Sequence, residues 1–319
     1  MPKKWLTLIF IFTLALTINL SAQDEDEDDW GTTDDDDDYG WAHNWEWNGY
    51  DWLNWKFDRP FMELNYGIGD YKHKDMFSKF ASAGSWELKL GYSDIGSADD
   101  NNIVDFNESF VFVSHISSRL SSQERKITEL PFDNWRFGIG KREGYGYDLG
   151  ALSILPYTQS GFVWTRVEME DYPAGIWITP LDDYFPRPGQ SAYNDYKILQ
   201  RYDKDFRFGT LVEGGVRFET ASVVSISAGY EAAVIFPRHL FWKHLGSLVI
   251  EETGKGALEY FIERVMDSSP AAAPIINVIL KIAYSYAFYA LKKDNMNWPF
   301  NTEKPLTYET FKFGVTFVF

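Results

Sequence analysis

The feature that most constrains the fold is an alternation of apolar with small or charged residues, repeated along most of the chain. In SWELKLGY, for example, Trp86, Leu88 and Leu90 alternate with Glu87 and Lys89. Successive strand residues point to opposite faces of a sheet, so each such segment predicts a strand with one apolar face. The clear segments are FMELNYGIG (61–69), SWELKLGY (85–92), NWRFGIGK (134–141), FRFGTLVEGGVRF (206–218) and VSISAGYEA (224–232), and weaker ones lie at 107–117, 145–155 and 162–168.

The N-terminal segment predicts export. Lys3 and Lys4 precede an apolar run at 5–20, and small residues follow at once. A basic, an apolar and then a small-residue region make up a secretory signal peptide, so we expect residues 1–22 to be removed. The sequence contains no Cys, which excludes disulfides and thiolate chemistry.

Composition favours a barrel in a membrane over a soluble sheet protein. Aromatic residues make up 18% of the chain, yet its mean hydropathy is −0.32. This pairing is typical of a transmembrane β-barrel, whose apolar residues are spread over alternate positions. The formal net charge is −17, and an exported, acidic protein is not expected to bind nucleic acid.

Residues 23–58 are predicted to lie outside the barrel, which we place at 59–319. Charge repulsion within the acidic tract 24–38 predicts disorder. The tract lacks the ligand spacing and the Gly turn of a calcium loop, so we predict neither a metal site nor a cofactor. The Trp-rich stretch 41–57 is either an interfacial segment at the lipid headgroups or a plug, and the sequence does not decide between them.

Three regions interrupt the alternation. Residues 172–202 are rich in Pro and Tyr and are expected to form an external loop or lid. Residues 238–268 have apolar positions at helical spacing and predict an amphipathic helical insertion. The stretch 275–291 fits either a helix or a strand; we favour the strand, which gives ten strands in total, whereas a helix there gives eight.

The C-terminal segment FKFGVTFVF (311–319) has Phe311, Phe313, Phe317 and Phe319 on one face. It resembles the terminal strand of bacterial outer-membrane β-barrels, which ends in Phe after alternating aromatics. The resemblance implies an all-β, antiparallel transmembrane barrel of about 8–10 strands in the outer membrane. It also implies that these four residues form the signal read by the barrel-assembly machinery, and that the surroundings are outer-membrane lipids and lipopolysaccharide. The sequence indicates no oligomeric state.

The predicted interior is balanced in charge. The charged residues expected opposite the apolar faces are five acidic and six basic: Glu63, Glu87, Lys89, Arg136, Asp148, Arg207, Glu213, Arg217, Glu231, Lys281 and Lys312. Small barrels are filled by side chains, and a balanced set can form mutual ion pairs. We therefore favour a narrow structural or binding barrel that is not an enzyme. The alternatives are a small solute-specific channel and a membrane-embedded acyl hydrolase.

The hydrolase alternative depends on VSHISSRLSSQ (113–123), in which His115 and Ser117 are two residues apart. The pair resembles the His-x-Ser motif of outer-membrane phospholipase A and lipid A deacylase, which implies His115 as base and Ser117 as nucleophile. If 118–131 is a loop, simple hairpin pairing sets Asn134 opposite His115 as an orienting amide. The same pairing turns His115 toward the lumen, and a shift of one residue would reverse this. We favour a plain hydrogen-bonded role for the two residues over catalysis.

Overall fold

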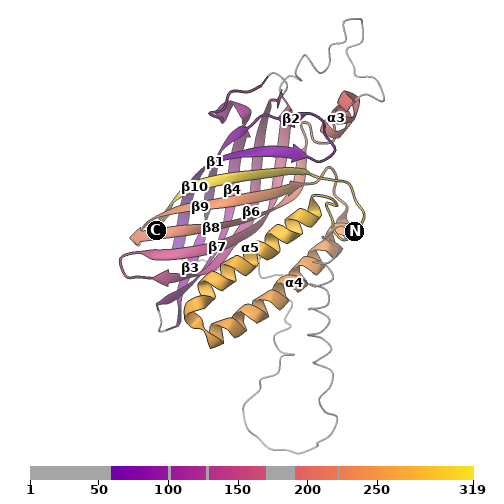
Figure 1. Ribbon diagram of the computed structural model, residues 1–319. Helices are drawn as coiled ribbons and strands as arrows, with labels where there is room; N and C mark the ends of the chain where they lie inside the picture. Colours follow the sequence, from indigo (N-terminus) through magenta and orange to yellow (C-terminus); the bar gives the residue numbers. More distant parts are fainter. Residues whose placement is uncertain (1–58, 100–101, 127–128, 170–190, 222) are drawn as a thin grey trace, which may run out of the picture.

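The computed structural model describes residues 59–99, 102–126, 129–169, 191–221 and 223–319, which are built around a closed antiparallel barrel (Figure 1). Around the cylinder the strands follow the order β1-β10-β9-β8-β7-β6-β4-β3. Their bounds are β1 Arg59–His73, β3 Ala83–Asp99, β4 Ile103–Ser117, β6 Phe132–Asp148, β7 Ser153–Met169, β8 Phe206–Ala221, β9 Val224–Ile235 and β10 Leu306–Val318. The predicted class is confirmed, with eight strands and not ten.

The last strand closes the barrel against the first. β10 pairs with β1 along its length, with Val315 opposite Leu64, and the backbone NH of Phe319 donates to the carbonyl of Pro60 at 2.9 Å. On its other edge β10 pairs with β9. Closure removes the free sheet edge, whose unpaired backbone groups would be costly in hydrocarbon.

The two ends of the barrel differ in the length of their connections. The end at which Arg59 and Phe319 meet carries the short connections 100–102, 149–152 and 222–223. The opposite end carries the long ones, 74–82, 118–131, 170–205 and 236–305. We call these the short-turn end and the long-loop end.

The predicted weak strand at 145–155 is wrong, because this stretch contains the turn between β6 and β7. Gly150 has a φ of +85°, a conformation that glycine adopts without steric cost. Its NH donates to Oδ1 of Asp148 at 2.8 Å and holds the turn. β7 is then one spanning strand that includes the predicted segment 162–168.

Short elements cover the long-loop end. Two parallel pieces, β2 (Lys79–Phe80) and β5 (Glu129–Leu130), pair with each other. The 3₁₀ turn η3 (Ser118–Leu120) follows β4, and the helix α3 (Ser191–Leu199) lies within the predicted loop 172–202, of which 172–190 is outside the described residues.

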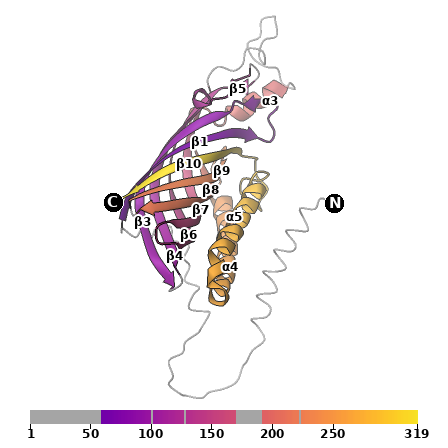
Figure 2. The same ribbon diagram turned by 60° about the vertical axis from the view of Figure 1, so that its left-hand side comes forward.

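A helical hairpin connects β9 to β10 in the sequence and lies along the outside of the barrel (Figures 1 and 2). It consists of α4 (Phe241–Ser268), the 3₁₀ turn η4 (Pro270–Ala272) and α5 (Ala273–Lys292), which packs against β6, β7, β8 and β9. α4 confirms the helical insertion predicted at 238–268.

α5 overturns the strand predicted at 275–291. Pro274 lies in the first turn of the helix, where its missing NH has no helical partner to lose. The exposed residues Ile275, Ile279, Ile282 and Tyr286 follow helical spacing, while Asn277 on another face is buried. The same residues also fit the alternation of a strand. The stretch is a helix because it packs against the barrel wall beside it.

Candidate functional site

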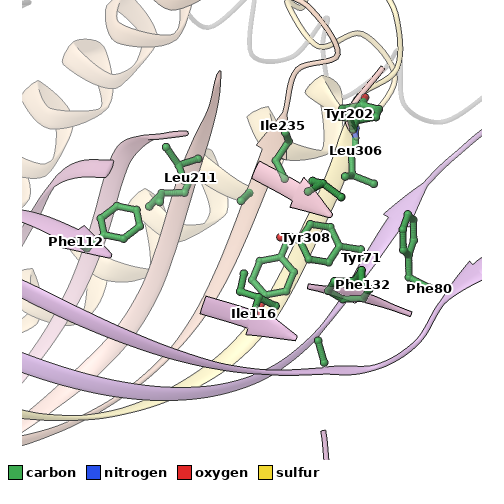
Figure 3. Packing of buried hydrophobic residues seen from close by; sticks show 14 of the residues in the cluster. Tyr71, Phe80, Phe112, Ile116, Phe132, Tyr202, Leu211, Ile235, Leu306 and Tyr308 are labelled. Atoms are coloured by element: carbon green, nitrogen blue, oxygen red, sulfur yellow. Dashed lines mark hydrogen bonds between the residues drawn. The ribbon is translucent and has the colours of Figure 1, made fainter. Parts of the chain in front are cut away.

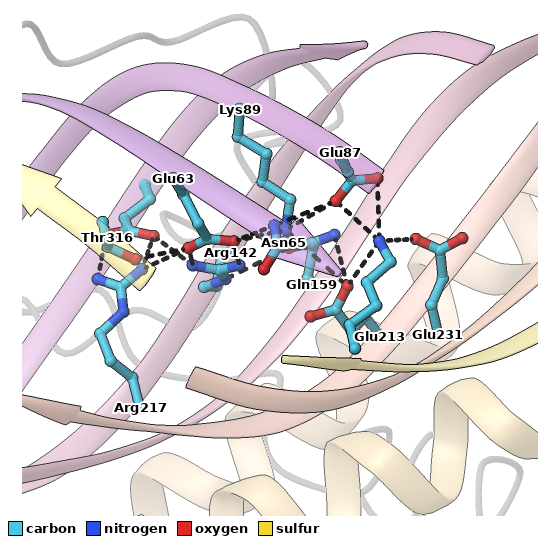
Figure 4. A network of polar contacts seen from close by, with 12 residues as sticks. Glu63, Asn65, Glu87, Lys89, Arg142, Gln159, Glu213, Arg217, Glu231 and Thr316 are labelled. Atoms are coloured by element: carbon cyan, nitrogen blue, oxygen red, sulfur yellow. Dashed lines mark hydrogen bonds and ion pairs between the residues drawn. The ribbon is translucent and has the colours of Figure 1, made fainter. Parts of the chain in front are cut away.

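The barrel interior contains a layer of buried charges, which we call the ionic layer. Inward positions on seven strands contribute five carboxylates and five cations, all nearly inaccessible to solvent: Glu63, Glu87, Glu108, Glu213, Glu231, Lys89, Arg136, Arg142, Arg217 and Lys312. Buried charges are tolerated when they are paired and hydrogen-bonded. Figure 4 shows that the side chains it labels among them converge on one another: Glu63, Glu87, Lys89, Arg142, Glu213, Arg217 and Glu231.

One part of the network is built from guanidinium–carboxylate contacts. Arg142 donates to both oxygens of Glu63, at 2.7 and 2.9 Å, and to Glu108 at 3.1 Å. Arg217 donates to both oxygens of Glu108, at 2.5 and 2.7 Å. The hydroxyl of Thr316 on β10 donates to Glu63 at 2.9 Å. Two-point contacts of this kind fix orientation as well as charge.

The other part is built around lysines. Nζ of Lys312 donates to Glu87 at 2.8 Å and to Glu213 at 3.4 Å, and it also contacts Glu231. Lys89 joins the two parts, because its Nζ lies 3.1 Å from Glu63 and 3.6 Å from Glu87. The ionic layer is therefore one connected set.

Aromatic side chains fill the lumen beyond the ionic layer on the long-loop side (Figure 3). Tyr71 packs edge-on against Phe132, with ring centroids 4.9 Å apart, and lies 4.6 Å from Tyr308. Phe80, from the connection between β1 and β3, packs on both Tyr71 and Phe132. These four residues are buried, and we call them the aromatic plug.

A second apolar cluster lies toward the short-turn end and consists of Phe106, Leu155 and Tyr157. The hydroxyl of Tyr157 donates to Glu213 at 2.7 Å and connects this cluster to the ionic layer. Within the described residues, side chains therefore occupy the lumen in three successive layers.

The long-loop end is held by specific hydrogen bonds. Asp195 on α3 accepts from the backbone NH groups of Phe77 and Ser78 at 2.9 and 2.8 Å. The hydroxyl of Tyr202 accepts from the backbone NH of Leu306 at 3.0 Å, and burial raises the pKa of this phenol. Together these contacts tie α3 and the segment after it to the rim of the barrel.

The predicted catalytic residues do not form one site: His115 lies on the outward face of the wall and Asn134 on the inward face. His115 pairs with Trp135, not with Asn134, so the register differs by one residue from simple hairpin pairing. Its imidazole is packed outside the lumen between Trp86 and Trp135, with ring centroids 6.0 and 4.7 Å away, and its Nε2 lies 2.5 Å from Oδ1 of Asp133.

Ser117 and Asn134 have partners of their own. Oγ of Ser117 accepts from the backbone NH of Arg119 at 3.2 Å. Asn134 is buried at an inward position, and its Oδ1 accepts from the NH of Glu168 at 3.3 Å. In the part of the chain that the structure describes, no hydrogen bond joins His115 to Ser117 or to Asn134.

Most of the predicted interior charges belong to the ionic layer. Of the eleven, Asp148 instead caps the turn at Gly150, Arg207 binds Asp205 at 2.9 Å, and Lys281 lies on α5 outside the barrel. Two members of the ionic layer, Glu108 and Arg142, are not among the predicted charges; they face each other across β4 and β6.

The sequence contains a signal for Glu108 and Arg142, but the alternation on β4 leaves open which face of the strand is inward. On β4 the neighbours of Glu108 on the inward face are Phe106 and Phe110, whereas the outward face carries Asn107 and Ser109, so the more apolar face of this segment is the one toward the lumen. The rings fit because glycines oppose them on β6: a Cβ on Gly140 would lie 2.7 Å from Phe110. A search for glycines opposite inward aromatics would have identified the face and with it Glu108 and Arg142.

No protein-family model and no curated protein matches this chain. Among solved structures it is similar to Neisserial surface protein A, with a TM-score of 0.38 and 11% identity over 82% of this chain and 97% of that one. It is also similar to Ail, the attachment invasion locus protein of Yersinia pestis, with a TM-score of 0.31 and 8% identity over 83% of this chain and 100% of that one. Both are eight-strand outer-membrane barrels. Similarity at this level carries no argument, and the architecture stands on the strand pairing of the chain itself.

Proposed function

We propose that this chain is an outer-membrane β-barrel with a sealed, structural interior, and that its long-loop end is the part that binds partners outside the cell. The observation that carries the proposal is the lumen filled by the ionic layer and the apolar clusters on either side of it. The outer wall and the two ends of the barrel supply the support for the membrane location.

The bare part of the outer wall has the character of a lipid-facing surface. Outward positions on β1, β3, β4 and β10 carry exposed apolar side chains: Leu64, Tyr66, Ile68, Leu90, Val111, Phe311, Phe313 and Val315. In water such a continuous patch would be an aggregation hazard. In a membrane barrel it is the surface that the hydrocarbon requires.

A cross-strand row of rings supports the same location. Trp86, His115 and Trp135 are direct neighbours on β3, β4 and β6, near the long-loop end. Trp is enriched where a membrane protein meets the headgroups, because the ring is apolar and its NH is polar. His115 then serves as a member of this belt, with Asp133 as its hydrogen-bond partner.

The asymmetry of the connections supports an orientation. Outer-membrane barrels have short periplasmic turns and longer external loops. We accordingly place the short-turn end, where β1 begins and β10 ends, in the periplasm, and the long-loop end outside among lipids and lipopolysaccharide. Phe311, Phe313 and Phe317 lie on outward positions of β10, and the exposed Phe319 follows the strand directly, so that the barrel-assembly machinery has access to all four during insertion.

A channel is the less favoured function because, among the residues that the structure describes, the lumen has neither open space nor a ring of single charge. Eight-strand barrels are just wide enough to be filled by side chains, and open channels belong to barrels of about sixteen strands. Charge selection needs a ring of one sign, whereas acidic and basic groups in the ionic layer neutralise one another.

Planar-bilayer recording of purified, folded protein tests the sealed barrel. We expect no single-channel steps, while a sixteen-strand porin inserted under the same conditions provides the positive control. Reproducible steps of uniform size from the folded protein would overturn the sealed interior and favour the channel.

We propose no hydrolytic function. A nucleophilic serine needs a base within hydrogen-bonding reach, and Ser117 and His115 each have another partner.

A further inference from the structure

The outer wall beneath α5 differs from the bare wall. A cross-strand row of outward positions there runs from Glu143 on β6 through Thr158 on β7 to Gly214 on β8. Gly214 leaves room for the helix, because a Cβ at this position would lie 2.6 Å from Ile282. On the neighbouring β9, the outward residues Ala232 and Val234 are buried and pack with Tyr289. The hairpin therefore covers a small and polar strip that lipid would solvate poorly.

Ion pairs attach the hairpin to this strip. Nζ of Lys281 on α5 lies 2.8 Å from Glu143, and Nζ of Lys255 on α4 lies 3.2 Å from the same carboxylate. Glu259 completes the group at 3.2 Å from Lys281. An outward-facing carboxylate in a lipid-exposed wall is costly, and the two lysines compensate Glu143 where it lies.

A second attachment fixes the C-terminal end of α5. Glu309 points outward from β10, and it accepts from the hydroxyl of Tyr289 at 2.9 Å and from Nζ of Lys293 at 2.5 Å. At the N-terminal end of α5, the hydroxyl of Tyr147 on β6 donates to the carbonyl of Ala271, just before the helix, at 2.7 Å. Tyr147 lies near the short-turn end and Glu309 near the long-loop end, so α5 runs along the height of the barrel wall.

The side of α5 that faces away from the wall has no charged residue. Its exposed side chains are Ile275, Ile279, Ala283, Tyr286 and Ala290, while Ile282 lies at the margin of this side, next to Gly214 of the wall. The helix has 20 residues, which corresponds to about 30 Å, the thickness of a bilayer's hydrocarbon core. Within the described residues, Pro270–Lys292 is the helical stretch that is long and apolar enough to cross a membrane.

We propose that the exposed stripe of α5 contacts the acyl chains of the outer membrane, so that this helix replaces the strands as the lipid-facing surface over β6–β9. The inference rests on the proposed membrane location of the barrel. The stripe continues into the apolar bare wall through aromatic contacts. Tyr286 on the stripe packs against Tyr289 with ring centroids 5.9 Å apart, and the cluster of Tyr289 includes Tyr230 on β9, which packs against Phe311 on β10 at 5.0 Å. The same hydrocarbon that surrounds the bare wall at that height then surrounds α5.

Depth-dependent fluorescence quenching tests the inference, because the chain has no native Cys. Three single-cysteine variants, Ile279→Cys, Phe313→Cys and Phe77→Cys, are labelled with an environment-sensitive dye and reconstituted into vesicles that contain lipids spin-labelled along the acyl chain. Phe313 reports on the bare wall, and Phe77, 80% exposed at the long-loop end, reports on water. A fourth variant, Tyr286→Cys, gives a second position on the stripe if Ile279→Cys folds poorly.

We expect the dye on α5 to lose its emission to the acyl-chain quencher as fully as the dye at 313, while the dye at 77 is quenched by aqueous iodide instead. Quenching at 313 but iodide access at 279 and 286 would overturn the inference and leave the barrel in the membrane. Iodide access at 313 as well would overturn the proposed membrane location itself, and the inference with it.

Discussion

At the scale of single residues, the buried charges of the lumen have the largest energetic consequences. The Arg142 side chain contacts both Glu63 and Glu108, and all three side chains are fully buried. Removing one member of a buried ionic set leaves its partners uncompensated, which costs more than the intact pair contributes. Because five carboxylates face five cations, a single neutralisation unbalances the whole layer.

We therefore expect Arg142→Met to lower the free energy of unfolding by about 3–5 kcal/mol, the cost of breaking a buried pair. The measurement is a denaturant titration of the folded barrel in vesicles. Arg166→Met is the matched control, because Arg166 and Glu168 form an ion pair whose side chains are 43% and 44% exposed. Exposed pairs contribute at most about 1 kcal/mol, so equal losses in the two variants would contradict a stabilising ionic layer.

The contacts of single residues also determine the role that we expect for His115 and Ser117. We expect no fatty-acid release above background from phospholipid or lipid A, with or without calcium, and no difference between the wild type and Ser117→Ala. The reason is that the imidazole is bound to Asp133 and Ser117 to a backbone NH. Release by the wild type that disappears in Ser117→Ala would show that the two side chains rearrange into a catalytic pair.

At the scale of elements, the sequence predicts a strand best where its two faces differ in character. In their middle segments β1, β3 and β10 have small, polar or charged residues inside and mostly large apolar ones outside, so their alternation is unambiguous there. β4 instead has large Phe residues on its inward face, and they are accommodated by glycines on a different strand. α5 is apolar at both helical and strand spacing, and the wall that it covers is assembled from four strands far away in the sequence. In both cases the missing information was a contact between distant segments.

The contact between α5 and the wall predicts the effect of filling its closest approach. Gly214→Val should push α5 outward, because the added Cβ would meet Ile282 at 2.6 Å. Ser285 lines a small space between β8, β9 and the hairpin, so in a Ser285→Cys background we expect maleimide labelling to become faster. Gly96→Val is the control, since a Cβ at Gly96 has nothing within 4 Å. Labelling that is equally slow in both backgrounds would argue against a tightly seated helix.

At the scale of the whole molecule, the interior can form only when the cylinder is closed. Lys312 on β10 binds Glu87 on β3, 225 residues away in the sequence, and Thr316 on β10 binds Glu63 on β1. Tyr308 of the same strand completes the aromatic plug. The last strand therefore contributes to the wall, to the ionic layer and to the plug, and a chain that fails to dock β10 loses all three together.

This dependence leads to the prediction for the C-terminal residue. Wild-type protein from the outer-membrane fraction should migrate differently on a gel before and after boiling, because a closed barrel resists unfolding by detergent. Deleting Phe319, or changing it to Asp, should reduce the amount of this heat-modifiable form and leave unassembled chain in the periplasm, since Phe319 ends the closing strand and its NH binds Pro60. Phe77→Asp is the control, because Phe77 is as exposed an aromatic but lies in the connection between β1 and β3. Identical migration of the wild type before and after boiling would contradict the membrane barrel, whereas normal assembly without Phe319 would contradict only its role as an assembly signal.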